Sequence, residues 1–223
     1  MEGGVWAIVV AAGEGRRFGG PKQFERLSGR SVVEWSVGSA RAAVDEVVLV
    51  LPSAQLAEAA LHAGCLYVTK GGMTRADSVR AGLAMVPDDA EIIVVHDAAR
   101  PLATPSLFFS VISAVRSGAD GAIPAVQISD TVKRVAEGRV IETLERDGLF
   151  SVQTPQAFQA RVLRRAHAGR ADATDDAALV EAIGGGILVV PGEARNRKIT
   201  DQDDVAVFEQ YLAQAQAEAT RTS

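Results

Sequence analysis

The chain has 223 residues, of which 48% are hydrophobic and 23% charged, and its formal net charge is −5. These values suit one globular domain spanning residues 1–223, and the negative balance argues against a nucleic-acid partner. Every apolar run is shorter than the about 20 residues that a membrane span needs, so we expect no membrane partner. The single cysteine excludes an internal disulfide and favours the reducing environment of the cytoplasm.

The first half of the chain alternates between strand-like and helical segments. The strand-like runs are rich in Val and Ile and apolar on both faces, as in strands that helices cover on each side. Ser31 followed by Glu34 predicts one helix start, and Thr104 followed by Pro105 predicts another. This alternation predicts an α/β fold with a doubly wound, mostly parallel sheet. The expected strands cover residues 5–10, 46–51, 65–69, 91–96 and 121–126.

The alternation stops after residue 126. Polar and apolar residues interleave on both sides of an AEGR turn within 127–150, which predicts an antiparallel hairpin. The hairpin lacks the apolar density of a core, so we expect a projecting arm that pairs with a second copy of the chain in a homodimer. Helices near 159–168 and 175–183, a strand at 186–190 and a last helix from Thr200 follow, with Thr174 as a candidate N-cap.

The segment AAGEGRRFGGPKQF follows the first predicted strand, at the sheet edge where ligands of open parallel sheets bind. Its glycines allow backbone N–H groups to approach a phosphate closely, and its cations supply local positive charge in an acidic chain. The segment therefore indicates a site for a polyanion. The glycines are Gly13, Gly15, Gly19 and Gly20, and the cations are Arg16, Arg17 and Lys22.

Other interpretations of this loop fit less well. A dinucleotide fingerprint needs G-x-G-x-x-G, but Phe18 occupies the place of the third glycine, and Glu34, the acidic residue at the expected distance, lies in a predicted helix. A Walker A loop needs G-K-[ST], which is absent from the sequence. A mobile surface loop without function is a further alternative. Neither a dinucleotide site nor a P-loop explains three cations among the glycines. A nucleoside triphosphate held by Arg and Lys explains them.

The loop resembles the G-x-G-x-R…P-K signature of nucleotidyltransferases that activate sugar or polyol phosphates. Together with six later segments, it is similar in order to the 2-C-methyl-D-erythritol 4-phosphate cytidylyltransferase family of the non-mevalonate isoprenoid pathway, over nearly the whole chain. The resemblance implies a Rossmann-like nucleotidyltransferase fold, transfer of CMP from CTP to a polyol phosphate, and Mg²⁺ as cofactor. The later segments are GGMTRADSV (71–79), VHDAARP (95–101), DTVKR (130–134), RDGLFSVQTPQAF (146–158), ATDDA (173–177) and RKIT (197–200).

The resemblance also implies roles for individual residues. The catalytic cations are Arg17, Lys22 and Lys198. The nucleotide-binding residues are Ala11, Ala12, Gly13, Gly15, Gly72, Ser78, Asp97 and Ala98, with Asp97 also a metal candidate. The acceptor-binding residues are Arg100, Thr131, Arg146, Thr154 and Thr174, of which Thr131 and Arg146 reach the active site of the neighbouring subunit from the arm.

The residues alone leave alternatives open at several of these positions. Asp97 is also readable as a helix cap, Gly72 as part of a tight turn, Lys198 as a solvated surface lysine and Thr174 as an N-cap. A phosphate nucleophile is already anionic, so no general base is needed and we expect structural roles for the three histidines. A different acceptor such as ribitol 5-phosphate, a catalytically silent nucleotide-binding regulator and an NAD-dependent dehydrogenase are the competing functions.

Overall fold

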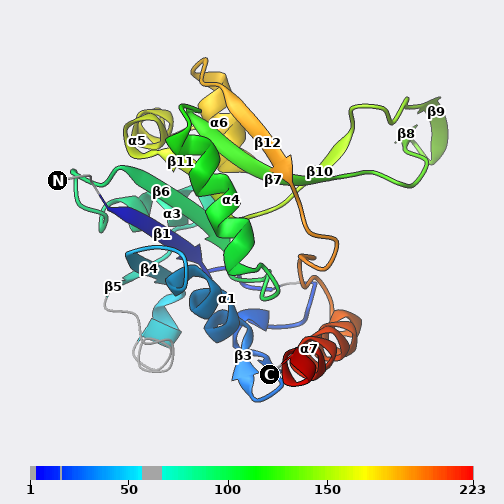
Figure 1. The fold of residues 1–223 in the computed structure, drawn as a ribbon. Coiled ribbons are helices and arrows are strands. Elements are labelled where there is room, and N and C mark those ends of the chain that lie inside the picture. Colours follow the sequence, from blue (N-terminus) through cyan, green and yellow to red (C-terminus); the bar gives the residue numbers. More distant parts are fainter. Residues whose placement is uncertain (1–3, 16, 57–66, 223) are drawn as a thin grey trace.

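The computed structural model describes residues 4–15, 17–56 and 67–222, so Arg16 and the first two residues of the strand expected at 65–69 lie outside the described residues. A mixed sheet forms its centre, with strand order β10-β7-β11-β6-β1-β4-β5 and β12 beside β7 (Figure 1). The strands of this sheet are β1 (Val5–Val10), β4 (Glu46–Leu51), β5 (Tyr67–Lys70), β6 (Ile92–Asp97), β7 (Gly121–Gln127), β10 (Phe150–Val152), β11 (Gln156–Gln159) and β12 (Ile187–Pro191). Two-stranded ladders are formed by β2 (Arg26–Leu27) with β3 (Arg30–Ser31) and by β8 (Lys133–Ala136) with β9 (Arg139–Thr143).

In the central sheet, four of the seven strand pairs are parallel, which confirms the predicted fold class. Strand β1 lies between β4 and β6 and pairs in parallel with both, and β5 and β12 also pair in parallel with their neighbours. Two short strands after the arm were not predicted: β11 lies antiparallel between β6 and β7, and β10 continues the antiparallel pairing along β7. The polar residues Gln153 and Thr154 before a proline separate these two short strands and hide them in the sequence.

Helices cover both faces of the sheet. Helices α1 and α4 pack on one face through an apolar cluster that includes Val37 and Phe108, whereas α3, α5 and α6 pack on the other through Val79, Leu163 and Val180. The helices are α1 (Val32–Arg41), α3 (Arg75–Leu83), α4 (Pro105–Arg116), α5 (Ala160–Ala168), α6 (Asp176–Ala182) and α7 (Asp203–Thr222), and 3-10 turns occur at Lys22–Phe24 and Ser53–Gln55.

The helix starts follow capping chemistry, with two differences from the expectations. Ser31 and Glu34 form the predicted capping box of α1, and the Thr104 side chain caps α4. Helix α6 is capped by Asp175, not Thr174, because the Asp175 carboxylate accepts from the Ala178 N–H at 3.0 Å. Helix α7 begins at Asp203 rather than Thr200, since the Thr200 N–H and hydroxyl both donate to the Asp204 carboxylate and hold residue 200 outside the helix.

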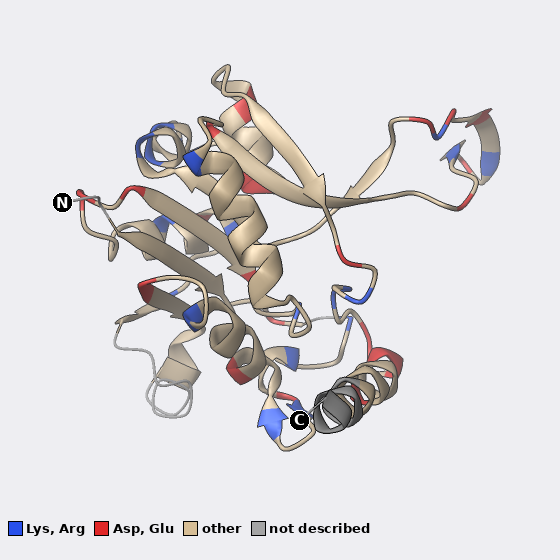
Figure 2. Ribbon diagram, viewed as in Figure 1, with Lys and Arg blue, Asp and Glu red and all other residues tan. Residues whose placement is uncertain are grey.

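Strands β8 and β9 form the predicted hairpin, which projects from the body as an arm (Figure 1). Every residue of the two strands is exposed, including Val135, Val140 and Ile141. Figure 2 shows charges of both signs at the tip of the arm, whereas the central strands carry few. Among the described residues, no helix is both long and apolar enough to cross a membrane.

Candidate functional site

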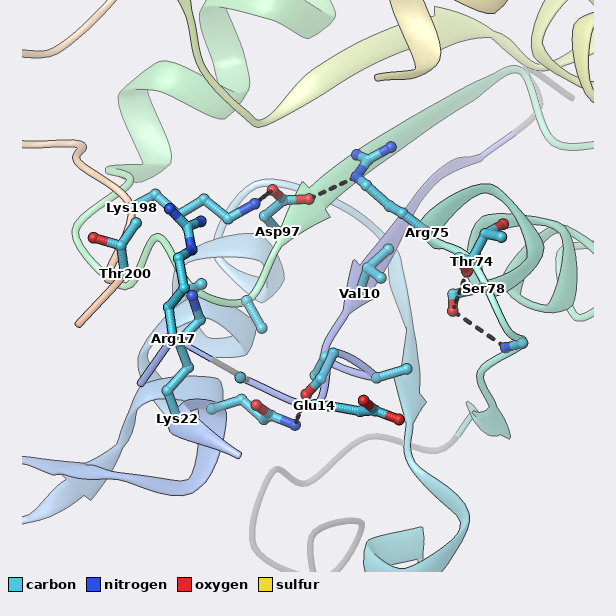
Figure 3. A pocket seen from close by; sticks show the side chains of 18 of the residues that line it. Val10, Glu14, Arg17, Lys22, Thr74, Arg75, Ser78, Asp97, Lys198 and Thr200 are labelled. Carbon is cyan, nitrogen blue, oxygen red and sulfur yellow. Dashed lines mark hydrogen bonds and ion pairs between the residues drawn. The ribbon is translucent and has the colours of Figure 1, made fainter. Parts of the chain in front are cut away.

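A cavity of about 710 Å³ opens where β1 and β6 end and where the turn after β5 leads into α3 (Figure 3). All residues predicted to be catalytic or nucleotide-binding line it, although they come from four separate segments of the chain. The structure thus brings together what the sequence could only predict piecemeal. The lining consists of Val10, Ala11, Ala12, Gly13, Glu14, Gly15, Arg17, Lys22, Gln23, Gly72, Met73, Thr74, Arg75, Ser78, Asp97, Ala98, Ala99, Lys198 and Thr200.

The glycine loop is a compact turn organised around Gly15. The Gly15 carbonyl accepts from the N–H groups of Phe18, Gly19 and Gly20 at 2.9, 3.1 and 3.3 Å. Gly15 has φ +65°, and a Cβ there would lie 1.8 Å from the Gly20 carbonyl oxygen, so this position requires glycine. Because the amides of Gly19 and Gly20 are already engaged, they do not form the expected phosphate nest. The side chains of Arg17 and Lys22, which line the cavity, are the groups of this loop best placed to contact an anion.

An apolar cluster brings the cations of the two ends of the chain together. Phe18, next to Arg17, and Ile199, next to Lys198, are both buried against Phe208 of α7. Burial of these anchors positions the two neighbouring cations at the cavity wall. Phe18, which breaks the dinucleotide fingerprint, thereby has a structural explanation.

Lys22 lies in the same cationic group. Its ammonium donates to the Ile199 carbonyl, which ties the glycine loop to the segment that carries Lys198. Burial lowers the pKa of Lys22, and the nearby charges of Lys198 and Arg17 lower it further. Bringing these cations together is unfavourable in the absence of a counter-charge, so a polyanion entering the cavity relieves their repulsion.

Asp97 ends β6 and is the charged centre of the cavity. Lys198 donates to its Oδ2 at 2.6 Å and Arg75 donates to its Oδ1 at 3.0 Å, from opposite sides (Figure 3). Burial alone would raise the pKa of Asp97, but Arg75 and Lys198 hold it well below its usual range. Its backbone N–H donates to the Thr154 hydroxyl at 3.0 Å. Asp97 is therefore an ionised carboxylate that orients two cations, and its hydrogen bonds do not support the helix-cap alternative.

The other end of the cavity is lined by backbone and small side chains. A Cβ on Gly71 would lie 2.2 Å from the Ala12 Cβ, so the turn after β5 and the turn after β1 are in close contact. The Gly72 N–H donates to the Ser78 hydroxyl at 3.2 Å, and a capping box formed by Thr74 and Asp77 starts α3 beside it. A wall of backbone and small side chains allows the close approach of a flat nucleobase. Met73 also lines the cavity, with 98% of its surface exposed.

Arg75 is a charged residue of the cavity that sequence reasoning missed. It is the first residue of α3 and donates to two carboxylates, Asp97 and, at 2.8 Å, Asp176. Its place inside the quoted GGMTRADSV segment, directly after the turn at the sheet edge, was the signal available in the sequence.

The predicted acceptor-binding residues lie outside the lining of this cavity. Arg100 donates to the carbonyls of Asn196 at 2.8 Å and Val152 at 3.3 Å, and burial lowers its pKa. Thr154 is buried, and its hydroxyl also lies 3.1 Å from the His96 Nδ1.

Thr131 and Arg146 are exposed on the arm, where the Arg146 guanidinium donates to the Ser129 carbonyl, and Thr174 is exposed just before α6. Within one chain, these acceptor residues do not form a joint site with the cavity.

Carboxylates that line the cavity are the candidate protein ligands for a metal ion. No group of three or more His, Cys, Asp or Glu side chains suited to a metal occurs among the described residues. Asp97 is the carboxylate best placed, and both of its oxygens already accept from cations. Mg²⁺ is commonly held by one or two carboxylates together with substrate phosphates. The residues present would fit a metal that arrives with a triphosphate, and Asp97 is the carboxylate placed to hold it.

Comparison with known proteins agrees with this geometry. The family model of 2-C-methyl-D-erythritol 4-phosphate cytidylyltransferase matches residues 5–214. A protein of that name from Frankia casuarinae is 45% identical over 94% of this chain and 81% of its own length, and one from Rubrobacter xylanophilus is 40% identical over 99% and 100%. The crystal structure of such a protein from Thermus thermophilus superposes with a TM-score of 0.80 at 31% identity, covering 96% of this chain and all of the other.

The match of the family model extends from β1 into α7 and so includes every segment that lines the cavity. The ordered motifs and the mixed sheet agree with it. The chain belongs to the 2-C-methyl-D-erythritol 4-phosphate cytidylyltransferase family.

Proposed function

We propose that this enzyme transfers CMP from CTP to 2-C-methyl-D-erythritol 4-phosphate, giving 4-diphosphocytidyl-2-C-methyl-D-erythritol and pyrophosphate. The observation that supports this most directly is a cavity lined by Arg17, Lys22, Lys198 and Arg75, in which Lys198 and Arg75 both contact Asp97 and the opposite wall consists of backbone and small side chains. Four cationic side chains in one cavity suit a triphosphate, and the wall of backbone and small side chains suits a pyrimidine base. Family membership supports the choice of donor and acceptor.

The reaction requires two anions to meet. An oxygen of the acceptor phosphate attacks the α-phosphorus of CTP in line with the bond to pyrophosphate, that bond breaks, and its electron pair leaves with pyrophosphate. The nucleophile is already ionised, so positioning and charge neutralisation provide the catalysis. In our proposal Arg17 and Lys22 bind the β- and γ-phosphates, and Lys198, held by Asp97, stabilises the charge that develops on the α-phosphate.

Mg²⁺ is the proposed cofactor. When bound, it would neutralise phosphate charge and orient the triphosphate, with Asp97 as the residue that holds it. Because Asp97 already contacts Lys198 and Arg75, the metal would share a carboxylate with both cations. Mg²⁺ titration of CTP binding by calorimetry, with Asp97→Asn as comparison, tests this assignment.

We also propose that the chain is a homodimer through the arm, residues 127–150, and that Thr131 and Arg146 act in the neighbour's site. An isolated two-stranded ribbon is marginally stable, and this one exposes Val135, Val140 and Ile141 by 55%, 61% and 62%. Cover from a second copy would explain these exposed side chains. A dimer would also place Thr131 and Arg146 of one arm near the cavity of the neighbouring subunit.

Mixing two inactive variants tests the arm directly. Arg146→Ala removes the acceptor contact and Lys22→Ala removes the nucleotide contact. In a mixed dimer, one of the two sites would combine an intact cavity with an intact arm. Activity recovered on mixing supports action across the dimer, whereas a monomer in light scattering or no recovery in an exchanged mixture contradicts it.

The catalytic function itself is tested by measuring CTP-dependent pyrophosphate release with a panel of polyol phosphates. We expect 2-C-methyl-D-erythritol 4-phosphate to give the highest kcat/KM. Preference for ribitol 5-phosphate would reassign the acceptor, and CTP binding without release under any acceptor would indicate a regulator. The proposed compartment is the cytoplasm, in keeping with a single cysteine.

A further inference from the structure

A row of hydrogen-bonded side chains, Asp97, Arg75, Asp176 and His167, extends from the cavity into the space between α3, α5 and α6. Arg75 donates through Nε to Asp97 and through Nη1 to Asp176 Oδ2. The other oxygen of Asp176 lies 3.0 Å from the His167 Nε2. The side chains of Asp176 and His167 are only 1% and 2% exposed, and neither lines the cavity. The proposed function assigns no role to this buried pair.

Charges alternate along the row. Lys198 and Arg75 share the Asp97 carboxylate, one on each oxygen, and Asp176 takes the far side of the Arg75 guanidinium. Arg75 Nη2, which lies beside Nε in the fork, is buried and has no hydrogen-bond partner among the described residues. A guanidinium can bind one carboxylate with two parallel hydrogen bonds. Without Asp176, the same fork would favour a second bond to Asp97.

We propose that Asp176 is a positioning residue for the reaction, acting through Arg75 and Asp97 on Lys198. By holding Nη1, it limits Arg75 to a single hydrogen bond with Asp97 and leaves the second carboxylate oxygen to Lys198. The ammonium that stabilises the α-phosphate is thereby held in place from a helix behind the cavity. This inference rests on the proposed function, because its main readout is the rate of cytidylyl transfer.

His167 completes the arrangement. Because the Asp176 carboxylate pairs with the Arg75 guanidinium, we assign its Oδ1 as an acceptor and the Nε2–H tautomer to His167, whose Nε2–H then donates to Oδ1 and fixes the carboxylate with Oδ2 toward Arg75. The His167 Nδ1 has no hydrogen-bond partner among the described side chains and backbone. Position 167 therefore needs a single donor at the place of Nε2, which a glutamine amide can also supply.

The first experiment is Asp176→Asn, which keeps the shape and removes the charge. We expect kcat to fall about tenfold through misplacement of Lys198, with the Kd for CTP within about twofold of wild type by calorimetry. Glu181→Gln, the same chemical change on the exposed side of α6, is the matched control and should keep the wild-type kcat. A folded Asp176→Asn protein with wild-type kcat and only a lower Tm would reduce Asp176 to a structural role.

A double mutant separates positioning from an independent effect. Arg75→Met removes the intermediary, so adding Asp176→Asn to it should change kcat by less than about twofold. A further tenfold loss in the double mutant would overturn the proposal. If Asp176→Asn does not fold, His167→Leu and His167→Gln decide the question: the leucine variant should lower kcat and the glutamine variant should restore it, while equal rates in both would refute the proposal.

Failure of the proposed function and failure of the positioning role of Asp176 give different results. Wild-type turnover is measured first, and its failure with every acceptor defeats the proposed function alone. The crystal structure of Asp176→Asn then tests positioning by itself. Arg75 is expected to make a second hydrogen bond to Asp97 through Nη2, and an unmoved Arg75 would overturn the proposal.

Discussion

Lys198→Ala is the sharpest test of the proposed mechanism. The Lys198 ammonium lies 2.6 Å from Asp97 Oδ2, and its side chain is 39% exposed. Removing a preorganised donor at the reacting centre typically costs about 2.7–4 kcal/mol, which corresponds to about 10²–10³ in kcat. Because this side chain is partly solvated, we expect the lower end of the range, a loss of about a hundredfold.

Stability should respond differently from rate. Asp97 loses one partner but keeps Arg75 and the Thr154 hydroxyl. A partly exposed ion pair contributes about 0–1 kcal/mol, so Tm should fall by no more than about 4 °C for a domain of this size. The variant should thus be folded and nearly inactive.

The assay is pyrophosphate release at saturating CTP and acceptor, with Tm from calorimetry on the same samples. Arg116→Ala removes an exposed cation at the end of α4, outside the cavity lining, and serves as control. A Lys198→Ala enzyme with kcat within about threefold of wild type would refute the transition-state role of the ammonium. A large loss of kcat that is explained by unfolding would leave the reasoning equally unsupported.

Three further predictions follow from local features. Burial, together with Lys198 and Arg17, lowers the pKa of Lys22, so kcat/KM for CTP should decline at alkaline pH with a midpoint below 10.5. The alkaline decline of kcat should lie at higher pH, because the phosphates of bound CTP favour the charged ammonium. Alkaline declines of kcat and kcat/KM at the same pH would contradict this. Gly15→Ala places a Cβ 1.8 Å from the Gly20 carbonyl oxygen at φ +65°, so calorimetry should show CTP affinity at least about tenfold weaker, and unchanged affinity would mean that the loop is not the phosphate site. Burial lowers the pKa of His96 from 6.5 to about 4, so in acid the unfolded chain takes up a proton that the folded chain does not. This contribution to the free energy of unfolding is complete above pH 6.5 and is lost as the pH falls toward 4, by up to about 3 kcal/mol in urea unfolding. The His96→Gln protein should show a smaller loss over the same pH range.

Local signals in the sequence identified much of the site. The glycines and cations of residues 13–22 are adjacent in the chain, and Asp97 directly follows a strand whose end marks the ligand-binding edge. Lys198 was identified by resemblance, because a single lysine in a polar segment has no distinguishing pattern. The structure places it 2.6 Å from Asp97.

What the sequence could not predict depends on distant contacts or on competition between equivalent residues. The Arg75–Asp176 pair joins positions 101 residues apart, and no periodicity encodes it. The antiparallel strand β11 is four residues long and lies between β6 and β7 only because the chain returns after the arm. Thr174 and Asp175 are both good N-caps, and only the backbone geometry selects Asp175.

The contact between Lys198 and Asp97 has a consequence for biogenesis. The two residues are 101 positions apart, and the anchor Ile199 is buried against α7, which follows β12 in the chain. During synthesis, the glycine turn of residues 13–20 would therefore emerge long before Lys198, whose ammonium contacts Asp97. Prematurely terminated translation products that end ahead of β12 should be able to fold in part yet have no turnover.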